Sequence, residues 1–234
     1  MMPFQAMRLR SAGSVVTFIA AAGAGYVNGA TSINSPSTPA GIANGDGLYA
    51  IVYARSALTP PAGWTLVANQ ANTGTLTQTL FVYRKTSVTT ADASAAFTWS
   101  QAASGRMGLA YVVARSSSGT ITDAQTGSAE TDIATSTAYP HNVTVPALTA
   151  GANGELFLTA ATSEVGTTSP SNDTWTAPAG ATLRATAAQP ENRLIVATQS
   201  RNNGQFNASA MTYAVAAGGS GTNYYSTITI RLAP

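Results

Sequence analysis

The chain is poor in charge, cysteine and histidine, and each shortage argues against a class of function. Only 9% of its 234 residues are charged, against roughly 25% in an average soluble domain. With no cysteine there are no disulfides and no thiolate metal sites. A zinc site needs three or four Cys, His or carboxylate ligands, and His141 is the only histidine. We therefore expect no metal and no cofactor.

The positive charge is small and scattered. The net charge is +2 and the basic residues are ten arginines and Lys85, spread from Arg8 to Arg231 without a run. A nucleic-acid surface needs basic residues clustered on one face, so we expect no nucleic-acid partner. No apolar run reaches the ~18 residues of a membrane span, so we expect no membrane partner. Residues 8–25 fit either a cleaved leader peptide or a strand preceded by a basic arm.

Apolar residues alternate with a period of two, or form short β-branched runs, along almost the whole chain. Clusters of Gly, Pro, Asn and Ser separate these runs at spacings typical of sandwiches and barrels. No window sustains the pattern of an amphipathic helix. The sequence predicts an all-β protein with strands at residues 14–20, 47–54, 79–85, 94–100, 109–115, 142–146, 155–162, 193–200, 209–215 and 226–232.

The chain also contains an internal repeat with a period of about 110 residues. Four segments of the first half recur in the same order in the second half: Gly45-Asp46 as Gly154-Glu155, Pro61-Ala62-Gly63 as Pro178-Ala179-Gly180, Phe81-Val82 as Ile195-Val196, and residues 95–99 as residues 209–213. We predict an arm at 1–12 and a single jelly-roll-like β-sandwich at 13–234, built from pseudo-repeats at about 13–118 and 119–234. No Pro-rich or charged linker separates the halves. We therefore expect them to share one core, each giving strands to both sheets; two separate sandwiches are the alternative.

The repeated residues are typical of turns. A glycine before an acid, followed by a β-branched run, makes a tight turn whose carboxylate can accept backbone N–H groups. This describes Gly45-Asp46 and Gly154-Glu155. Pro-Ala-Gly supplies a fixed φ and then a residue able to take positive φ, as in a type II turn. We therefore assign a structural turn role to all of these positions: Gly45, Asp46, Pro61, Gly63, Gly154, Glu155, Pro178 and Gly180.

Residues 30–115 resemble a domain found in structural proteins of tailed bacteriophages and in related bacterial surface proteins. The resemblance is carried by "PAGIANGDGLYA" (39–50), "PPAGWT" (60–65), "VYRK" (82–85) and "ADASAAFTW" (91–99). The second half is similar to the downstream part of such proteins, with weaker matches. The resemblance implies a jelly-roll-like component of a virion or cell surface. It brings no catalytic residues with it.

Reactive groups offer few candidates for catalysis or metal binding. His141 lies in "YPHNVTVP" without a nucleophile context such as G-x-S-x-G, and we expect no catalytic residue. Asp123, Glu130 and Asp132 could gather around Ca²⁺ with backbone carbonyls, or alternate along a strand into water. A glycosidase pair needs two carboxylates about 5–9 Å apart. Asp46 and Asp92 are the candidates for such a pair, although turn capping explains both more simply.

The aromatic residues allow a second type of site. Trp64, Trp175, Tyr224 and Tyr225 could form a platform on which sugar rings stack. The alternative is that the tryptophans pack the core, with Trp99 beside Phe97 on one strand face.

From these observations we expect a non-enzymatic structural protein on the outside of a tailed-phage virion. A capsid decoration or head-fibre role is favoured over a tail or adsorption component. The expected partners are the major capsid protein, other virion proteins and further copies of the chain, in a homo-oligomer that the resemblance implies is a trimer. The alternative functions are a carbohydrate-binding module that recognises bacterial surface glycans and, third, a carboxylate hydrolase.

Overall fold

The computed structural model describes residues 13–34, 36–72, 77–133, 141–148, 151, 153–165, 174–189, 192–200, 212–216 and 223–234. Apart from one turn of 3₁₀ helix at Thr90–Asp92, the regular structure within these ranges consists entirely of β-strands. The all-β prediction is therefore confirmed. The predicted arm at 1–12 lies outside the described residues.

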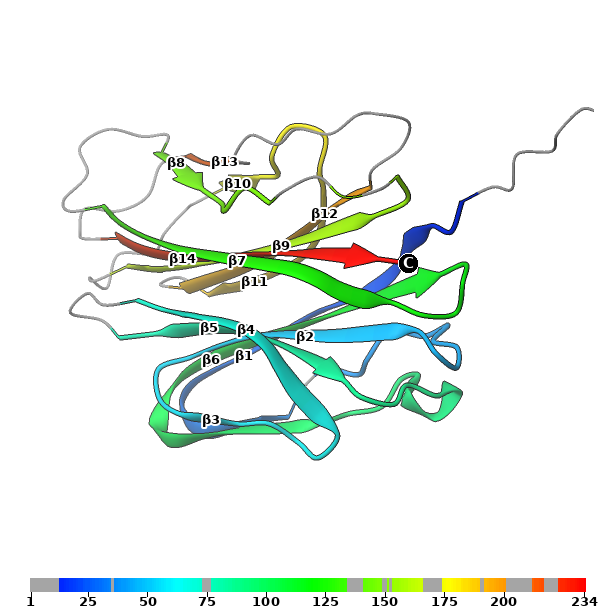
Figure 1. Ribbon diagram of the computed structural model, residues 1–234. Helices are drawn as coiled ribbons and strands as arrows, with labels where there is room; N and C mark the ends of the chain where they lie inside the picture. Colours follow the sequence, from blue (N-terminus) through cyan, green and yellow to red (C-terminus); the bar gives the residue numbers. More distant parts are fainter. Residues whose placement is uncertain are drawn as a thin grey trace, which may run out of the picture.

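The first half of the chain builds one antiparallel sheet, which we call the N-terminal sheet (Figure 1). Its strand order is β1-β6-β2-β5-β4, and the short β3 pairs with β6 beside this path. The strands are β1 (Val16–Asn34), β2 (Gly47–Ala54), β3 (Leu58–Thr59), β4 (Trp64–Ala71), β5 (Thr79–Lys85) and β6 (Thr98–Ser116).

The second half builds a matching C-terminal sheet, in the order β11-β12-β9-β14-β7, and a small sheet β10-β13-β8. Figure 1 shows the small sheet stacked on the outer side of the C-terminal sheet. The strands are β7 (Thr122–Ile133), β8 (His141–Thr144), β9 (Leu156–Val165), β10 (Thr174–Thr176), β11 (Thr182–Gln189), β12 (Asn192–Ser200), β13 (Thr212–Ala216) and β14 (Asn223–Ala233).

Read from opposite ends, the two large sheets have the same topology. β1, β6, β2, β5 and β4 correspond to β7, β14, β9, β12 and β11. The small sheet supplies the rest of the repeat: Trp99 of β6 pairs with Ile33 of β1, and Tyr213 of β13 pairs with Val143 of β8. In the first half β1 and β6 are continuous, whereas the second half divides each into two strands. The two similar halves predicted from the sequence are thus confirmed.

The large sheets pack face to face around a core to which both halves contribute, which we call the shared core. Tyr49 and Ile51 of β2 lie in it, together with Leu158 of β9 and Ile228 of β14. One expectation was wrong: each large sheet comes from a single half, so neither half gives strands to both. Pairing within a half closes shorter loops, which costs less chain entropy than exchange between halves.

Each half also has an outer core on the far face of its own sheet. The N-terminal outer core gathers residues such as Leu48, Trp99 and Leu109, and the C-terminal outer core gathers residues such as Trp175 and Tyr225. Strand β2 is therefore buried on both faces, along its entire length. Its unbroken apolar sequence "LYAIVYA" is typical of a strand covered on both sides.

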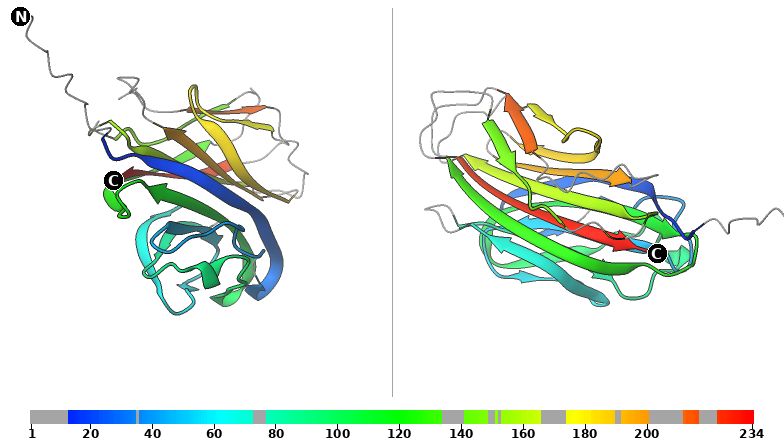
Figure 2. Two further views of the ribbon diagram at one scale, coloured as in Figure 1. Left: turned by 90° about the vertical axis from the view of Figure 1, so that its right-hand side faces the viewer. Right: turned by 45° about the horizontal axis from the view of Figure 1, so that its top comes forward.

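The edges of the two sheets meet along two seams. At one seam β4 lies against β7, and at the other β1 lies against β11; the left view of Figure 2 shows β1 alongside β11. Because β7 corresponds to β1 and β11 to β4, the same two kinds of strand meet at both seams. This is the arrangement of a twofold dimer, here within a single chain.

Candidate functional site

The repeated glycines occupy equivalent turns with positive φ. The angles are 83° at Gly45 and 87° at Gly154, and 81° at Gly63 and 82° at Gly180. The Ala181 N–H donates to the Pro178 carbonyl at 2.9 Å, which closes a β-turn with Gly180 at its third position. Positive φ at the third position but not at the second is typical of a type II turn, and it favours glycine.

The two glycines that precede the acids also lie where the halves meet. A Cβ on Gly154 would lie 2.3 Å from the Ser14 carbonyl oxygen, and one on Gly45 would lie 3.5 Å from that of Gly119. The Gly154 turn of the second half therefore lies against the residues just before β1. The Gly45 turn of the first half lies against the residues just before β7. At Gly154 the approach includes a hydrogen bond, in which the Val16 N–H donates to its carbonyl at 2.6 Å.

Asp46 and Glu155, which follow these glycines, are both buried and both paired with arginine. Asp46 accepts two hydrogen bonds from Arg115, at 2.7 and 2.8 Å, and one from the Ala43 N–H at 2.8 Å. The hydrogen bond to Asp46 raises the pKa of Arg115. Glu155 faces Arg231 with 3.7 Å between Oε1 and Nε. Both carboxylates thus hold a turn against the strand that carries the arginine.

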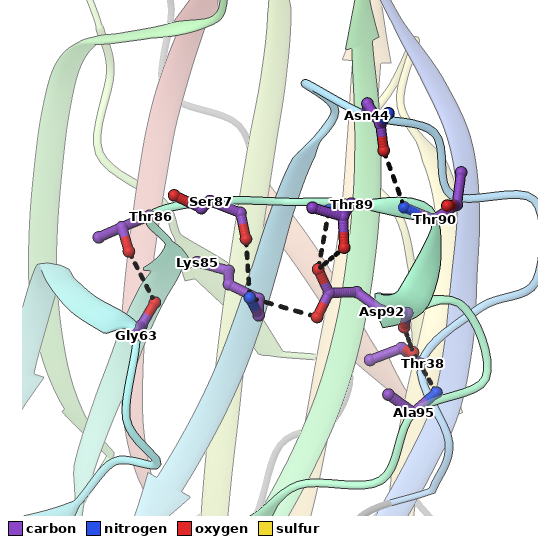
Figure 3. A network of polar contacts seen from close by, with 10 residues as sticks. All are labelled: Thr38, Asn44, Gly63, Lys85, Thr86, Ser87, Thr89, Thr90, Asp92 and Ala95. Atoms are coloured by element: carbon purple, nitrogen blue, oxygen red, sulfur yellow. Dashed lines mark hydrogen bonds and ion pairs between the residues drawn. The ribbon is translucent and has the colours of Figure 1, made fainter.

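Asp92 ties together the loop between β5 and β6 (Figure 3). Its side chain accepts the Thr89 N–H at 2.8 Å and pairs with Lys85 Nζ at 3.2 Å. Its backbone carbonyl accepts the Thr38 hydroxyl, which in turn accepts the Ala95 N–H at 3.0 Å. Asp46 and Asp92 are each committed to such structural contacts, so the suggested glycosidase pair finds no support here.

The proposed sugar platform is not at the surface. Trp64 is 7% exposed and packs against Trp99 and Tyr111, with ring centroids 5.2 and 5.8 Å away. Trp175 is 9% exposed, and Tyr224 and Tyr225 are buried as well. This corrects the expectation of glycan contact at all four residues, because burial leaves no ring face for a sugar to stack on.

The structure separates the three acids that were suggested as calcium ligands. Asp123, Glu130 and Asp132 all belong to the extended strand β7. At about 3.3 Å per residue, Asp123 lies more than 20 Å along the strand from the other two acids, so the three cannot share one ion. The side chains of Glu130 and Asp132, and that of His141, lie outside the described part of the structure. Among the described residues, no group of three or more potential ligands could hold a metal ion.

Asp123 instead forms a polar cluster at the β4–β7 seam. The Tyr49 hydroxyl donates to Asp123 Oδ1 at 2.7 Å, and Arg84 Nη1 donates to Oδ2 at 3.3 Å. The Arg84 guanidinium also lies 5.9 Å from the centre of the Tyr49 ring. Burial, and then the charge of Asp123, raise the pKa of Tyr49, so this hydroxyl remains a donor. The cluster joins β2 and β5 of one half to β7 of the other.

Next to this cluster the seam is hollowed into a groove of about 640 Å³, which we call the seam groove. Its volume falls within the range of roughly 300–1,000 Å³ found for small-molecule sites. Arg84 and Asp123 both line it. The other lining residues are Thr65, Leu66, Val67 and Thr86 from one half and Ala124 and Thr126 from the other.

At the opposite seam, between β1 and β11, a side chain of the protein lies across the junction. The Arg184 guanidinium lies 3.9 Å from the centre of the Phe18 ring, and its Nε donates to Thr198 Oγ1 at 2.8 Å. Burial lowers the pKa of Arg184. Strand registers show that Arg184 corresponds to Val67, Phe18 to Asp123 and Thr198 to Arg84. The equivalent seams therefore carry different side chains.

Sequence reasoning placed Asp123 among the candidates but missed Tyr49, Arg84 and the seam groove. Tyr49 and Arg84 are far from Asp123 in the sequence, so no local pattern connects them. The strands that form the groove, β4 and β7, were not predicted. The signal in the sequence was that the two halves of the repeat match imperfectly. One of the mismatches is Val67 in the first half against Arg184 in the second.

Comparisons with known proteins give no neighbour for this chain. No family model matches it, and neither the curated proteins nor the solved structures contain a match. None of the described segments is a helix long and apolar enough to cross a membrane.

Proposed function

We propose that this chain is a non-enzymatic structural protein on the surface of a tailed-phage virion, in a capsid decoration or head-fibre role. The proposal rests on the resemblance of residues 30–115 to phage structural domains, together with the way the chain uses its acids. All four acids with described side chains are ion-paired in structural contacts: Asp46 with Arg115, Asp92 with Lys85, Asp123 with Arg84 and Glu155 with Arg231. Carboxylates held in this way stabilise turns and seams.

The proposed mechanism is assembly by surface complementarity. A sandwich of two large sheets packed face to face, with an outer core on each side, is a rigid building block, because close-packed protein interiors have low compressibility. Leu66 and Leu183 are the large hydrophobic residues exposed within the described structure, at 44% and 39%. They occupy equivalent positions on the two outer strands β4 and β11. Such apolar positions suit contacts with neighbouring copies or with the capsid shell.

The direct test uses purified tailed-phage particles whose genome encodes this chain. We expect mass spectrometry to detect the chain in intact particles at many copies, with a stoichiometry that tracks the major capsid protein. Absence from intact particles would refute the virion role. A few copies per particle would instead indicate a tail or adsorption component.

The arm at residues 1–12 supplies a second test. Its sequence "MMPFQAMRLRSA" lacks a pattern of its own, and we propose that it docks the protein onto the particle. Deletion of these residues should abolish incorporation without changing the thermal unfolding of the domain. Incorporation at normal levels would exclude the docking role.

Light scattering of the purified full-length chain should give three times its mass of 23.7 kDa if the oligomer is a trimer.

A further inference from the structure

The seam groove is open because equivalent positions differ between the halves. Each of the four edge strands at the seams contains a β-bulge, with Val67 in β4, Arg184 in β11, Ala124 in β7 and Ile19 in β1 as the extra residues. At the β4–β7 seam both extra residues are small and line the groove. At the other seam Arg184 is large and covers Phe18, whereas Ile19 packs against the N-terminal outer core. The two equivalent places thus differ in side-chain volume, and the one with less volume is the groove.

The lining of the groove is electrically neutral but rich in hydrogen-bonding groups. Arg84 and Asp123 cancel each other's charge, and they are 29% and 21% exposed. A guanidinium has five donors and a carboxylate accepts about four hydrogen bonds, so the pair can bind further groups without separating. The remaining polar groups are threonine hydroxyls, at Thr65, Thr86 and Thr126. Because the two charges cancel, the groove has no net charge to attract either an anion or a cation, which favours a neutral, polar ligand.

The backbone at the groove is poorly suited to an added peptide strand. Strand addition needs a regular edge with an uninterrupted row of N–H and C=O groups. Both edge strands are bulged where they line the groove, at Val67 and Ala124, and a bulge disrupts the hydrogen-bond ladder. Recognition at this place therefore falls to side chains.

We infer that the seam groove is a binding site for a neutral saccharide. Arg84, Asp123 and the threonines would bind its hydroxyl groups, and the exposed Leu66 would cover an apolar C–H face. The inference does not depend on the proposed virion role, because it concerns the isolated chain and is tested without particles.

The test is an array of neutral oligosaccharides, acidic oligosaccharides and peptides, probed with the full-length chain and followed by titration with the best-bound neutral oligosaccharide. We expect binding to neutral oligosaccharides. Val67→Arg brings in the residue found at the other seam, and Ala124→Ile adds side-chain volume to the groove lining. Each variant should weaken binding at least tenfold, about 1.4 kcal/mol. Thermal unfolding should show that both variants remain folded.

A matched pair of surface variants locates the binding. Leu66→Ala should weaken binding, whereas Leu183→Ala, at the equivalent exposed position of the other seam, should leave it unchanged. Three results would overturn the inference: no binding to any neutral oligosaccharide, binding to acidic glycans or peptides alone, or undiminished binding in both groove-filling variants. Equal effects of the two leucine variants would also contradict it.

Discussion

The two outer cores are built on the same strands but with different chemistry. In the N-terminal half, Leu109 and Tyr111 of β6 face the outer core. The register of β14 places Thr227 and Thr229 at the equivalent positions of the C-terminal half. The Thr227 hydroxyl lies within hydrogen-bonding distance of the Ala129 and Thr144 carbonyls, at 3.3 and 3.2 Å.

This difference shows how one topology can be held together in two ways. Ala129 belongs to β7 and Thr144 to β8, the two strands that correspond to the continuous β1 of the first half. The first half keeps β1 in one piece and packs a large apolar cluster beneath it. The second half divides that strand, and a threonine hydroxyl bridges the pieces.

The largest expected effect comes from removing a tryptophan in each outer core. Trp99 is fully buried and its Nε1 donates to the Tyr111 hydroxyl at 3.0 Å. We expect Trp99→Ala to lower the free energy of unfolding by about 3–5 kcal/mol. Trp175→Ala should cost roughly 2 kcal/mol, because that residue belongs to a smaller cluster and keeps some exposure. Urea unfolding followed by far-ultraviolet circular dichroism measures both; equal losses would contradict the difference between the cores.

The two buried acids that pair with arginine, Asp46 and Glu155, should also differ in how much they contribute to the free energy of unfolding. Asp46→Asn removes the negative charge and one of the two oxygens that accept hydrogen bonds from Arg115. It should cost about 1–2 kcal/mol, a value reduced by the 42% exposure of the Arg115 side chain. Glu155→Gln weakens a contact of 3.7 Å and should cost about 1 kcal/mol or less. Chemical denaturation of the two variants tests this order. A larger loss of unfolding free energy in Glu155→Gln than in Asp46→Asn would show that the distance between carboxylate and guanidinium does not set the order of the two effects.

The threonine bridge can be tested by a substitution of similar shape. Thr227→Val removes the hydroxyl shared by β7 and β8 and leaves the buried volume nearly unchanged. We expect a loss of about 1 kcal/mol in the free energy of unfolding, together with faster amide hydrogen exchange in β8. The control is Thr65→Val on the exposed face of β4, which should have almost no effect. Unchanged exchange in β8 would rule out the bridge.

The smallest effect concerns pH. The pKa of Tyr49 is raised in the folded protein, whereas an unfolded tyrosine titrates near 10. Its contribution to stability is therefore complete below about pH 10 and falls as the pH rises further, because the unfolded chain loses the proton first. Tyr49→Phe should make the decline of the urea midpoint above this pH shallower. An identical decline in the variant would show that Tyr49 is not responsible.

The strongly apolar strands could be read directly from the sequence, whereas several edge strands could not. The segments now seen as β2, β5, β9, β12 and β14 were predicted because burial on one or both faces demands a clear apolar pattern. Strands β4, β7 and β11 were missed. Each lies at a sheet edge with an exposed side, and β7, "TDAQTGSAETDI", contains almost no large apolar residue. Pairing with a neighbour, rather than local preference, makes these segments strands.

The site was harder to predict than the fold. Turn residues such as Gly63 and Gly180 can be recognised locally, because a type II turn needs positive φ at a fixed place. The tryptophans were candidates for a sugar platform because a sequence does not say which side of a strand is covered. The Arg84–Asp123 pair depends on contact between two sheets, which no local pattern records.

The sequence alone determined the all-β class, the duplication and the turn positions, because alternation, repetition and glycine placement are local properties of a chain. Only the tertiary structure decided that each half forms its own sheet and that the sheets share a core. It also decided that one seam is covered by Arg184 while the other leaves a groove beside Arg84 and Asp123. These features depend on which edges meet and how much side-chain volume lies between them, and both are fixed by packing across the whole molecule.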